Sequence, residues 1–232
     1  RRRHTRYWRD WSSDVCSSDL LHRRRSHPEP LGRNWRTARA DVRSHPPRRT
    51  ALVESVAGLV LAAGEGRRFG GPKAPAIVDG ERLVDRAVRI LREAGCSEVV
   101  VVLGAWVGEV PGATVIENPD WASGMGSSLR AGLTWLEQES SCTKTVVTLV
   151  DLPGLTSVAI ARVADCPGDI AVAVYDGERG HPVAIARRHW PEVIESARGD
   201  RGARDFLRGH ADEVVVVEVG DVATGEDLDE PA

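Results

Sequence analysis

The sequence predicts an α/β protein in which a mostly parallel sheet carries helices on both faces, a three-layer α/β/α Rossmann-like arrangement. Short apolar or β-branched runs, typical of buried strands, alternate along the chain with segments whose apolar residues recur at helical spacing. This alternation is typical of parallel sheets covered on both sides. A third observation is that several expected strands end in loops rich in Gly, Ser or Asp, where such sheets bind ligands.

The expected strands cover residues 58–62, 98–103, 113–117, 145–150, 169–174, 182–186 and 213–219. The expected helices cover residues 83–93, 125–136, 157–164, 189–197 and 202–209, and Gly95 is a suitable stop signal for the first of them. Because parallel strands end at one edge of the sheet, we expect the loops after Ala62, Glu117 and Val150 to share one cleft.

Composition indicates an ordinary globular protein with no membrane partner. The 232 residues are 41% hydrophobic and 28% charged, and no apolar run approaches the roughly 20 residues that span a bilayer. We see no signal peptide. The cysteines at 16, 96, 142 and 166 have no metal-binding spacing, so we expect reduced thiols and a cytoplasmic location.

The first 50 residues differ sharply from the rest. They contain 14 arginines and 5 acidic residues, a net charge of +9, whereas the remainder carries −12. A basic tail with interspersed tryptophans can bind nucleic acid, but this one has no periodicity, so we do not expect nucleic acid as a partner. The stretch 11–20 resembles translated sequencing-adapter sequence. We therefore predict a disordered or non-native extension over residues 1–55 and one domain over residues 56–232.

The loop after the first strand carries the clearest chemical pattern, LAAGEGRRFGGPK at residues 61–73. Its glycines let backbone N–H groups approach phosphate oxygens, and Arg68 and Lys73 add positive charge. The chain has 29 arginines and only two lysines, so Lys73 suggests a position that requires a compact ammonium group. The spacing matches neither a Walker loop nor a dinucleotide-binding fingerprint.

Two further segments end expected strands. Residues 118–132 (NPDWASGMGSSLRAG) enter a helix start whose N–H groups can bind a base or an anion, although a simple capped helix explains the same residues. Asp151 follows a buried strand in the sequence Val-Asp-Leu-Pro, where a carboxylate can bind Mg²⁺ or cap a turn.

Taken together, these segments resemble the MobA-like NTP transferase family, and most closely its molybdenum cofactor cytidylyltransferases. The resemblance also covers Gly-His-Pro at 180–182, Gly-Asp-Arg-Gly-Ala-Arg at 199–204 and the stretch 221–228. It implies a nucleotidyltransferase fold and CTP as the donor, because Ala63 gives Leu-Ala-Ala-Gly rather than Leu-Ala-Gly-Gly. It also implies nucleotide contacts at Leu61, Ala62, Ala63, Gly64, Gly66, Lys73, Asn118, Gly126, Ser127 and Ser128.

The same resemblance implies acceptor contacts at His181, Arg201 and Arg204, although a structural turn histidine and solvated helix arginines explain these residues equally well. The sequence departs from the family pattern at the terminal motif, where Ala223 replaces an expected Asp and Gly225 replaces Pro. Asp221 is then the residue expected to share the metal with Asp151. Gly66 and Phe69 stand where the family has Ser and Met.

The sequence thus predicts an enzyme that moves CMP from CTP to the terminal phosphate of molybdopterin and releases pyrophosphate. The expected catalytic residues are Lys73, Arg68 and Asp151, and the expected metal is Mg²⁺ on Asp151 and Asp221. A molybdoenzyme that receives the cofactor is a further expected partner. Two alternatives remain open: another phosphorylated acceptor, such as a sugar, polyol or phospholactate, and a catalytically silent nucleotide-binding chaperone for molybdoenzyme maturation.

Overall fold

A computed structural model describes residues 55–229 of the chain. The predicted extension therefore lies, apart from its last residue, outside the described residues, and so does Cys16. The three cysteines within the described range are Cys96, Cys142 and Cys166, all of them free and buried. No helix between residues 55 and 229 is long and apolar enough to cross a membrane.

The described strands form a seven-stranded sheet in the order β5-β4-β1-β6-β8-β7-β9 and a separate two-stranded hairpin, β2-β3. Their bounds are β1 Val56–Leu61, β2 Ile77–Val78, β3 Glu81–Arg82, β4 Glu98–Leu103, β5 Thr114–Glu117, β6 Lys144–Leu149, β7 Ile170–Tyr175, β8 Glu178–Ala186 and β9 Val214–Glu218. The α-helices are α2 Leu83–Glu93, α3 Met125–Glu139, α4 Ser157–Ala164, α5 Trp190–Ser196 and α6 Arg204–Gly209. Three short 3₁₀ turns are η1 Trp121–Ser123, η2 Arg187–His189 and η3 Gly199–Arg201.

The mostly parallel sheet predicted from the sequence is confirmed. Strands β5, β4, β1 and β6 pair in parallel, and β7 pairs in parallel with β9. Strand β8 runs against both of its neighbours. The helix predicted to stop at Gly95 does so, since Gly95 has a φ of +92° and its N–H donates to the carbonyl of Arg92.

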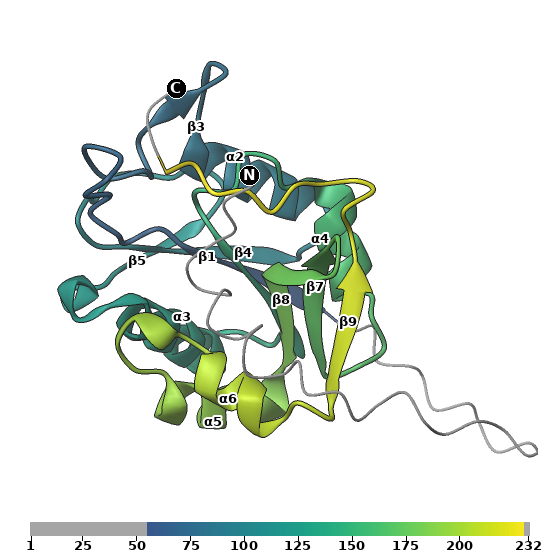
Figure 1. The fold of residues 1–232 in the computed structure, drawn as a ribbon. Helices are drawn as coiled ribbons and strands as arrows, with labels where there is room; N and C mark the ends of the chain where they lie inside the picture. Colours follow the sequence, from purple (N-terminus) through teal and green to yellow (C-terminus); the bar gives the residue numbers. More distant parts are fainter. Residues whose placement is uncertain (1–54, 230–232) are drawn as a thin grey trace, which may run out of the picture.

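The sheet separates two apolar cores (Figure 1). Helices α2 and α4 pack together on one face, and α3, α5 and α6 pack together on the other. In α2 the buried residues Leu83, Val84, Ala87, Val88 and Leu91 recur at helical spacing, which explains why one stripe of this helix faces the sheet. The three predicted layers are therefore present.

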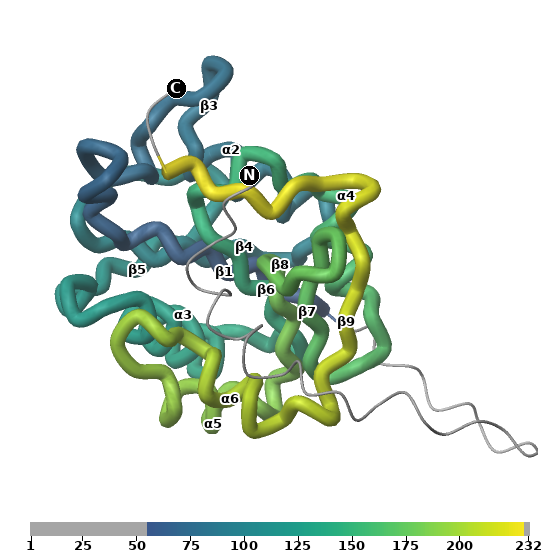
Figure 2. Tube along the Cα trace, in the orientation of Figure 1, coloured from purple at the N-terminus to yellow at the C-terminus, as the bar shows by residue number. Residues whose placement is uncertain are grey.

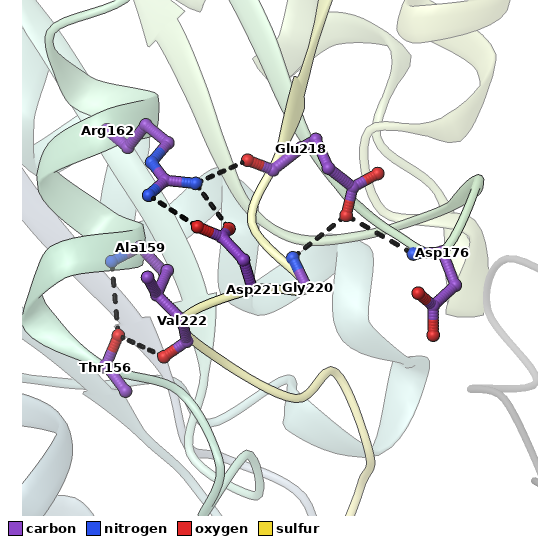
Figure 3. A network of polar contacts seen from close by, with 8 residues as sticks. All are labelled: Thr156, Ala159, Arg162, Asp176, Glu218, Gly220, Asp221 and Val222. Carbon is purple, nitrogen blue, oxygen red and sulfur yellow. Dashed lines mark hydrogen bonds and ion pairs between the residues drawn. The ribbon is translucent and has the colours of Figure 1, made fainter.

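The C-terminal segment, residues 219–229, leaves β9 and crosses the face that carries α4 (Figure 2). Arg162 of α4 holds its start, donating to both carboxylate oxygens of Asp221 at 2.6 and 3.1 Å and to the carbonyl of Glu218 (Figure 3). The hydroxyl of Thr156, which caps α4, donates to the carbonyl of Val222 at 3.1 Å. These contacts direct the segment toward the loop that follows β6.

Its next contacts lie along that loop. The N–H of Thr224 donates to the carbonyl of Gly154 at 3.1 Å, and the N–H of Leu228 donates to the carbonyl of Asp151 at 2.9 Å. A Cβ atom on Gly154 would lie 1.9 Å from the hydroxyl of Thr224, so glycine is needed for this close approach. The segment thus runs along the carboxyl end of β6.

We predict that Gly132→Ala destabilises the protein by about 1–3 kcal/mol. A Cβ at this position of α3 would lie 2.5 Å from a methyl group of Leu59 in β1, and this overpacking outweighs the helix-propensity gain of about 1 kcal/mol. Thermal or urea unfolding measures the change. Gly209→Ala is the matched control in α6, where an added Cβ meets nothing within 4 Å. Equal stability changes for the two variants would contradict the assignment of Gly132 to a close helix–sheet contact.

Candidate active site

A cavity of about 450 Å³, called the main cavity below, opens where β1 and β6 end. It is lined by residues of the three loops predicted to share a cleft, and that prediction is confirmed. The lining comprises Leu61, Ala62, Ala63, Gly64, Glu65, Gly66, Arg67, Lys73, Trp121, Ala122, Gly124, Met125, Ser128, Leu149, Val150, Asp151 and Asp200.

The Gly-rich loop owes its shape to Gly66. This residue has a φ of +63°, and its carbonyl accepts from the N–H groups of both Gly70 and Gly71, at 2.9 and 3.2 Å. A Cβ on Gly66 would lie 1.9 Å from the carbonyl oxygen of Gly71. Any side chain here would therefore open the loop, which explains in physical terms why this chain has glycine at position 66.

Lys73 lies at the end of this loop beside Asp151. Its ammonium is 2.7 Å from a carboxylate oxygen of Asp151, and the two side chains are only 15% and 19% exposed. Arg68 is 66% exposed and donates to Asp229 at 3.0 Å; a carboxylate oxygen of Asp229 also lies 4.0 Å from the Lys73 ammonium. Lys73 and Arg68, the two side chains predicted to contact phosphate, thus form ion pairs with acidic residues. Arg67, not Arg68, lines the main cavity.

A second acidic residue of the C-terminal segment, Asp227, lies near this cluster, although it does not line the main cavity. Burial, together with the negative charges of Asp151 and Asp229, raises the pKa of Asp227 to about 6. Its Oδ1 atom is buried and has no hydrogen-bond partner. A buried carboxylate oxygen without a donor, close to a second carboxylate, fits a divalent cation with hard oxygen ligands, such as Mg²⁺ or Mn²⁺.

Asp221 lies elsewhere. Its carboxylate is engaged by Arg162, an interaction that also lowers the pKa of Asp221, and it is absent from the lining of the main cavity (Figure 3). The structure therefore does not bring Asp221 and Asp151 together as the sequence analysis expected. Ala223 is buried in the apolar core beneath α4, so the position of the missing acid points away from the cavity.

The predicted base-contacting residues form a rigid turn at the start of α3. The amide of Asn118 is buried and donates to the hydroxyls of Ser127 and Ser128 at 2.8 and 3.0 Å. Of the residues predicted here, Ser128 lines the main cavity, whereas Asn118 and Ser127 lie behind it. Gly126 allows close packing, since a Cβ there would lie 2.8 Å from the backbone nitrogen of Arg198.

The predicted acceptor-side residues do not line the main cavity. His181 is buried beneath it, in a small gap that shares Leu61 and Met125 with the cavity lining. Arg201 is 66% exposed and lies 3.3 Å from Asp205, and Arg204 begins α6. From the stretch 199–204 it is Asp200 that reaches the cavity.

Sequence reasoning missed several cavity residues, above all Trp121 and Asp200. Trp121 fits because Gly104 lacks a side chain: a Cβ on Gly104 would lie 2.5 Å from the Cβ of Trp121 and 2.9 Å from that of Ala63. Asp200 fits because Gly124, with a φ of +107°, leaves no Cβ to strike the backbone of Gly199 at 2.5 Å. The signal in the sequence was a glycine at positions 104 and 124. Each glycine makes room for a residue that is distant in the sequence, so its effect could not be inferred without the fold.

The fold and the cavity together define an α/β nucleotidyltransferase. Residues 58–214 match the family model of the MobA-like NTP transferase domain. The chain therefore belongs to the MobA-like NTP transferase family, as its sequence motifs indicated.

Curated relatives of this chain have different named functions. The chain is 40% identical over 190 residues to the nicotine blue oxidoreductase of Paenarthrobacter nicotinovorans, an alignment that covers 75% of this chain and 92% of that protein. It is 29% identical over 165 residues to the molybdenum cofactor guanylyltransferase of Rhizobium johnstonii, covering 67% of this chain and 76% of that protein. Family membership therefore does not by itself fix the substrates.

Solved structures show the same fold. A homologue of the Mycobacterium tuberculosis protein Rv0371c, from Mycobacterium sp. strain JC1, is 27% identical and superposes with a TM-score of 0.63, covering 75% of this chain and 90% of that one. Rv0371C itself has been solved in complex with manganese; it is 23% identical, with a TM-score of 0.58 and coverage of 71% and 88%.

We predict that the buried imidazole of His181 makes stability depend on pH. Burial lowers the pKa of His181 from 6.5 to about 4 in the folded chain, so the unfolded chain binds more protons between these values. The free energy of unfolding should therefore fall by about 3 kcal/mol from this site as the pH drops from 7 to 4. Urea unfolding of the wild type and His181→Gln across this range measures the effect. Parallel pH profiles for the two proteins would show that His181 does not titrate as described.

Proposed function

We propose that the chain transfers CMP from CTP to the terminal phosphate of molybdopterin or its molybdenum-bound form, with release of pyrophosphate. The proposal includes Mg²⁺ as the cation, the cytoplasm as the compartment and a molybdoenzyme as the final recipient of the product. It rests on the family, which transfers nucleotides, on the motifs given above and on one observation. That observation is the pairing of Lys73 with Asp151 in a cavity shaped by a Gly-rich loop, with the buried carboxylate of Asp227 close by.

The cluster has the charge balance of a site that binds an anion and a cation together. Three carboxylates, on Asp151, Asp227 and Asp229, meet two cationic groups, on Lys73 and Arg68. Lys73 can neutralise one carboxylate at a time. The pKa of Asp227 is raised first by burial and then by the negative charges of Asp151 and Asp229. When Mg²⁺ is bound by Asp151 and Asp227, it supplies charge neutralisation at the phosphates and at the departing pyrophosphate.

The residues of the chain then position the reactants. Backbone N–H groups of the loop at 64–66 and the ammonium of Lys73 hold the phosphates, while Arg68 exchanges Asp229 for a phosphate oxygen. A terminal phosphate oxygen of the acceptor attacks the α-phosphorus, the bond to the bridging oxygen breaks and pyrophosphate leaves. The attacking phosphate is already anionic near pH 7, so the site needs no strong general base. Positioning and charge neutralisation account for the catalysis.

CTP is supported by Ala63. Ala63 is one of the residues that line the main cavity, and a glycine at position 63 would remove a methyl group from this lining. The smaller space favours a pyrimidine base over the larger purine base, and one methyl group in a pocket changes the relative binding free energy by about 1–3 kcal/mol.

The proposal is tested with the purified full chain, measuring pyrophosphate release. CTP with Mg²⁺ and molybdopterin should give turnover, and GTP should give at least about tenfold less. Parallel reactions contain a sugar phosphate, a polyol phosphate or phospholactate instead of molybdopterin. Turnover only with one of these would move the proposal to that acceptor. Binding of CTP without turnover on any acceptor would overturn it in favour of a silent nucleotide-binding chaperone.

A second candidate function follows from the 40% identity to nicotine blue oxidoreductase, which spans 92% of that protein. The chain would then reduce a conjugated heterocycle, with the nucleotide part of a redox co-substrate in the main cavity. The test is consumption of a reduced nicotinamide dinucleotide, followed by absorbance, with nicotine blue as the acceptor. Reduction of this dye in the absence of any pyrophosphate release would favour the second function over the first.

We predict that Lys73→Ala lowers pyrophosphate release by about 10²-fold or more, because a phosphate loses its main charged contact. Steady-state kinetics measures the loss. Lys73→Arg keeps the charge and should retain part of the activity. Arg89→Ala, on the outer face of α2 where it pairs with Glu81 and Glu93, is the matched charge-removal control. Near-normal turnover of Lys73→Ala would remove this residue from the mechanism.

We also predict opposite outcomes for two aspartates of the C-terminal segment. Asp227→Asn should lower metal-stimulated turnover by about 10²-fold, because it removes the charge of a buried carboxylate that interacts electrostatically with Asp151. Asp221→Asn should stay near wild type, since this carboxylate pairs with Arg162. Titrations of Mg²⁺ and Mn²⁺ against the reaction rate separate the two. Loss of metal stimulation in Asp221→Asn alone would restore the metal assignment expected from the sequence.

A further inference from the structure

A second group of metal-ligating side chains lies outside the main cavity, on the other side of the helix pair α5 and α6. Helices α5 and α6 pack against each other (Figure 1), and they are joined through η3, whose Asp200 lines the main cavity. The residue just before α5 and the residue just after α6 come together. These residues are His189 and His210, joined by Glu192 from the first turn of α5. One ligand atom from each of the three lies within 4.8 Å of the others.

The hydrogen bonding of His210 prepares it as a ligand. Its Nδ1 atom lies 3.1 Å from the carbonyl oxygen of Phe206, which can only accept a hydrogen bond. Nδ1 therefore carries the proton, and Nε2 presents its lone pair. A backbone carbonyl in this position is the usual partner of a metal-binding histidine. Nε2 of His210 lies 3.5 Å from a carboxylate oxygen of Glu192, close enough for both to bind one ion.

His189 is the more enclosed of the two histidines. Its side chain is 12% exposed, its ring packs edge-on against Phe206, and its Nε2 atom is buried without a hydrogen-bond partner. An imidazole nitrogen without a hydrogen-bond partner has a lone pair that a metal ion can use.

The surrounding charges suit a cation. Glu192 and Glu213 act on His189 as negative charges, and a carboxylate oxygen of Asp169 lies 3.7 Å from its Nε2. Arg188, the cationic side chain that acts on His189, forms an ion pair with Asp169, which offsets its charge. Glu192 is 57% exposed, which leaves the cluster open to an ion from solvent.

We propose that His189, Glu192 and His210 form a binding site for a transition metal of the Zn²⁺ type. Two imidazoles and one carboxylate are a ligand set that Zn²⁺ uses, with a fourth position for water. Imidazole also selects Zn²⁺, Co²⁺ or Ni²⁺ over Mg²⁺, which prefers oxygen ligands such as Asp151 and Asp227. The chain thus has two chemically distinct cation sites.

Metal in this site would join the two open ends of the α5–η3–α6 hairpin. The turn of that hairpin carries Asp200 into the main cavity and packs against Gly124 at the start of α3. Closing the open ends would therefore stiffen the support of Asp200 without placing the metal among the reacting groups. This is a structural site, and it is independent of the proposed transfer reaction.

The experiment is a titration of the full chain with Co²⁺ alone, followed by visible absorption, with Zn²⁺ as the competitor. Tetrahedral Co²⁺ with nitrogen ligands absorbs far more strongly than octahedral Co²⁺ on carboxylates, so the spectrum separates this site from Asp151 and Asp227. We expect one strongly absorbing equivalent, displaced by Zn²⁺. Zn²⁺ at about 100 times its dissociation constant should also raise the Tm by about 5 °C.

The variants are His189→Gln, His210→Gln and Glu192→Gln, and the matched control is Glu195→Gln, an exposed glutamate one turn further along α5. Each ligand variant should weaken Co²⁺ binding by about tenfold or more, whereas the control should match the wild type. Glu192 is exposed, so its variant folds irrespective of the role of the histidines. An unchanged band in Glu192→Gln and His210→Gln, or no strong band in the wild type, would overturn the proposal.

Discussion

The arrangement of the site depends on two backbone hydrogen bonds between the C-terminal segment and the loop after β6. Thr224 and Leu228 donate to Gly154 and Asp151, and this pairing places Asp227 next to Asp151. The two aspartates are 76 positions apart in the sequence, so nothing local could bring them together. Arg162 and Thr156 donate hydrogen bonds to Asp221 and Val222, and these bonds hold the start of the same segment against α4. Contacts far from the main cavity therefore help to position Asp227.

The electrostatics of the cluster follow from this pairing. The negative charges of Asp151, Asp227 and Asp229 lie close together, which is unfavourable unless positive charge is nearby, and Lys73 and Arg68 supply it. In the proposed reaction, the same two side chains contact the triphosphate. Binding of a nucleotide with its cation would thus exchange internal ion pairs for external ones, so the site is charged and preorganised before its ligands arrive.

Much of the fold could be predicted because its elements are locally encoded. The predicted ends are confirmed for the helix over residues 83–93 and the strand over residues 98–103. A helical apolar stripe and a β-branched run each identify their element without information from the rest of the chain. The reversed direction of β8 was not predictable, since a buried strand has the same pattern in either direction. The β2-β3 hairpin was too short to show any pattern.

Only part of the site could be predicted from the sequence. Lys73, Asp151 and the Gly-rich loop follow strands directly, so their meeting at one sheet edge could be inferred from topology alone. The proximity of Asp227 to Asp151 could not be predicted, because it depends on the path of the C-terminal segment, and the sequence motif indicated Asp221 instead. Asp200 was missed for a similar reason: its entry into the cavity depends on Gly124, from a different element.

The central claim is that Asp151 and Asp227 hold the cation that accompanies a nucleotide in the main cavity. A crystal of the protein soaked with CTP and Mn²⁺, measured for anomalous scattering by manganese, tests it most directly. The account predicts a manganese peak between the carboxylates of Asp151 and Asp227, with the phosphates beside Lys73. A peak at Asp221, or CTP bound with no metal at Asp227, would contradict it.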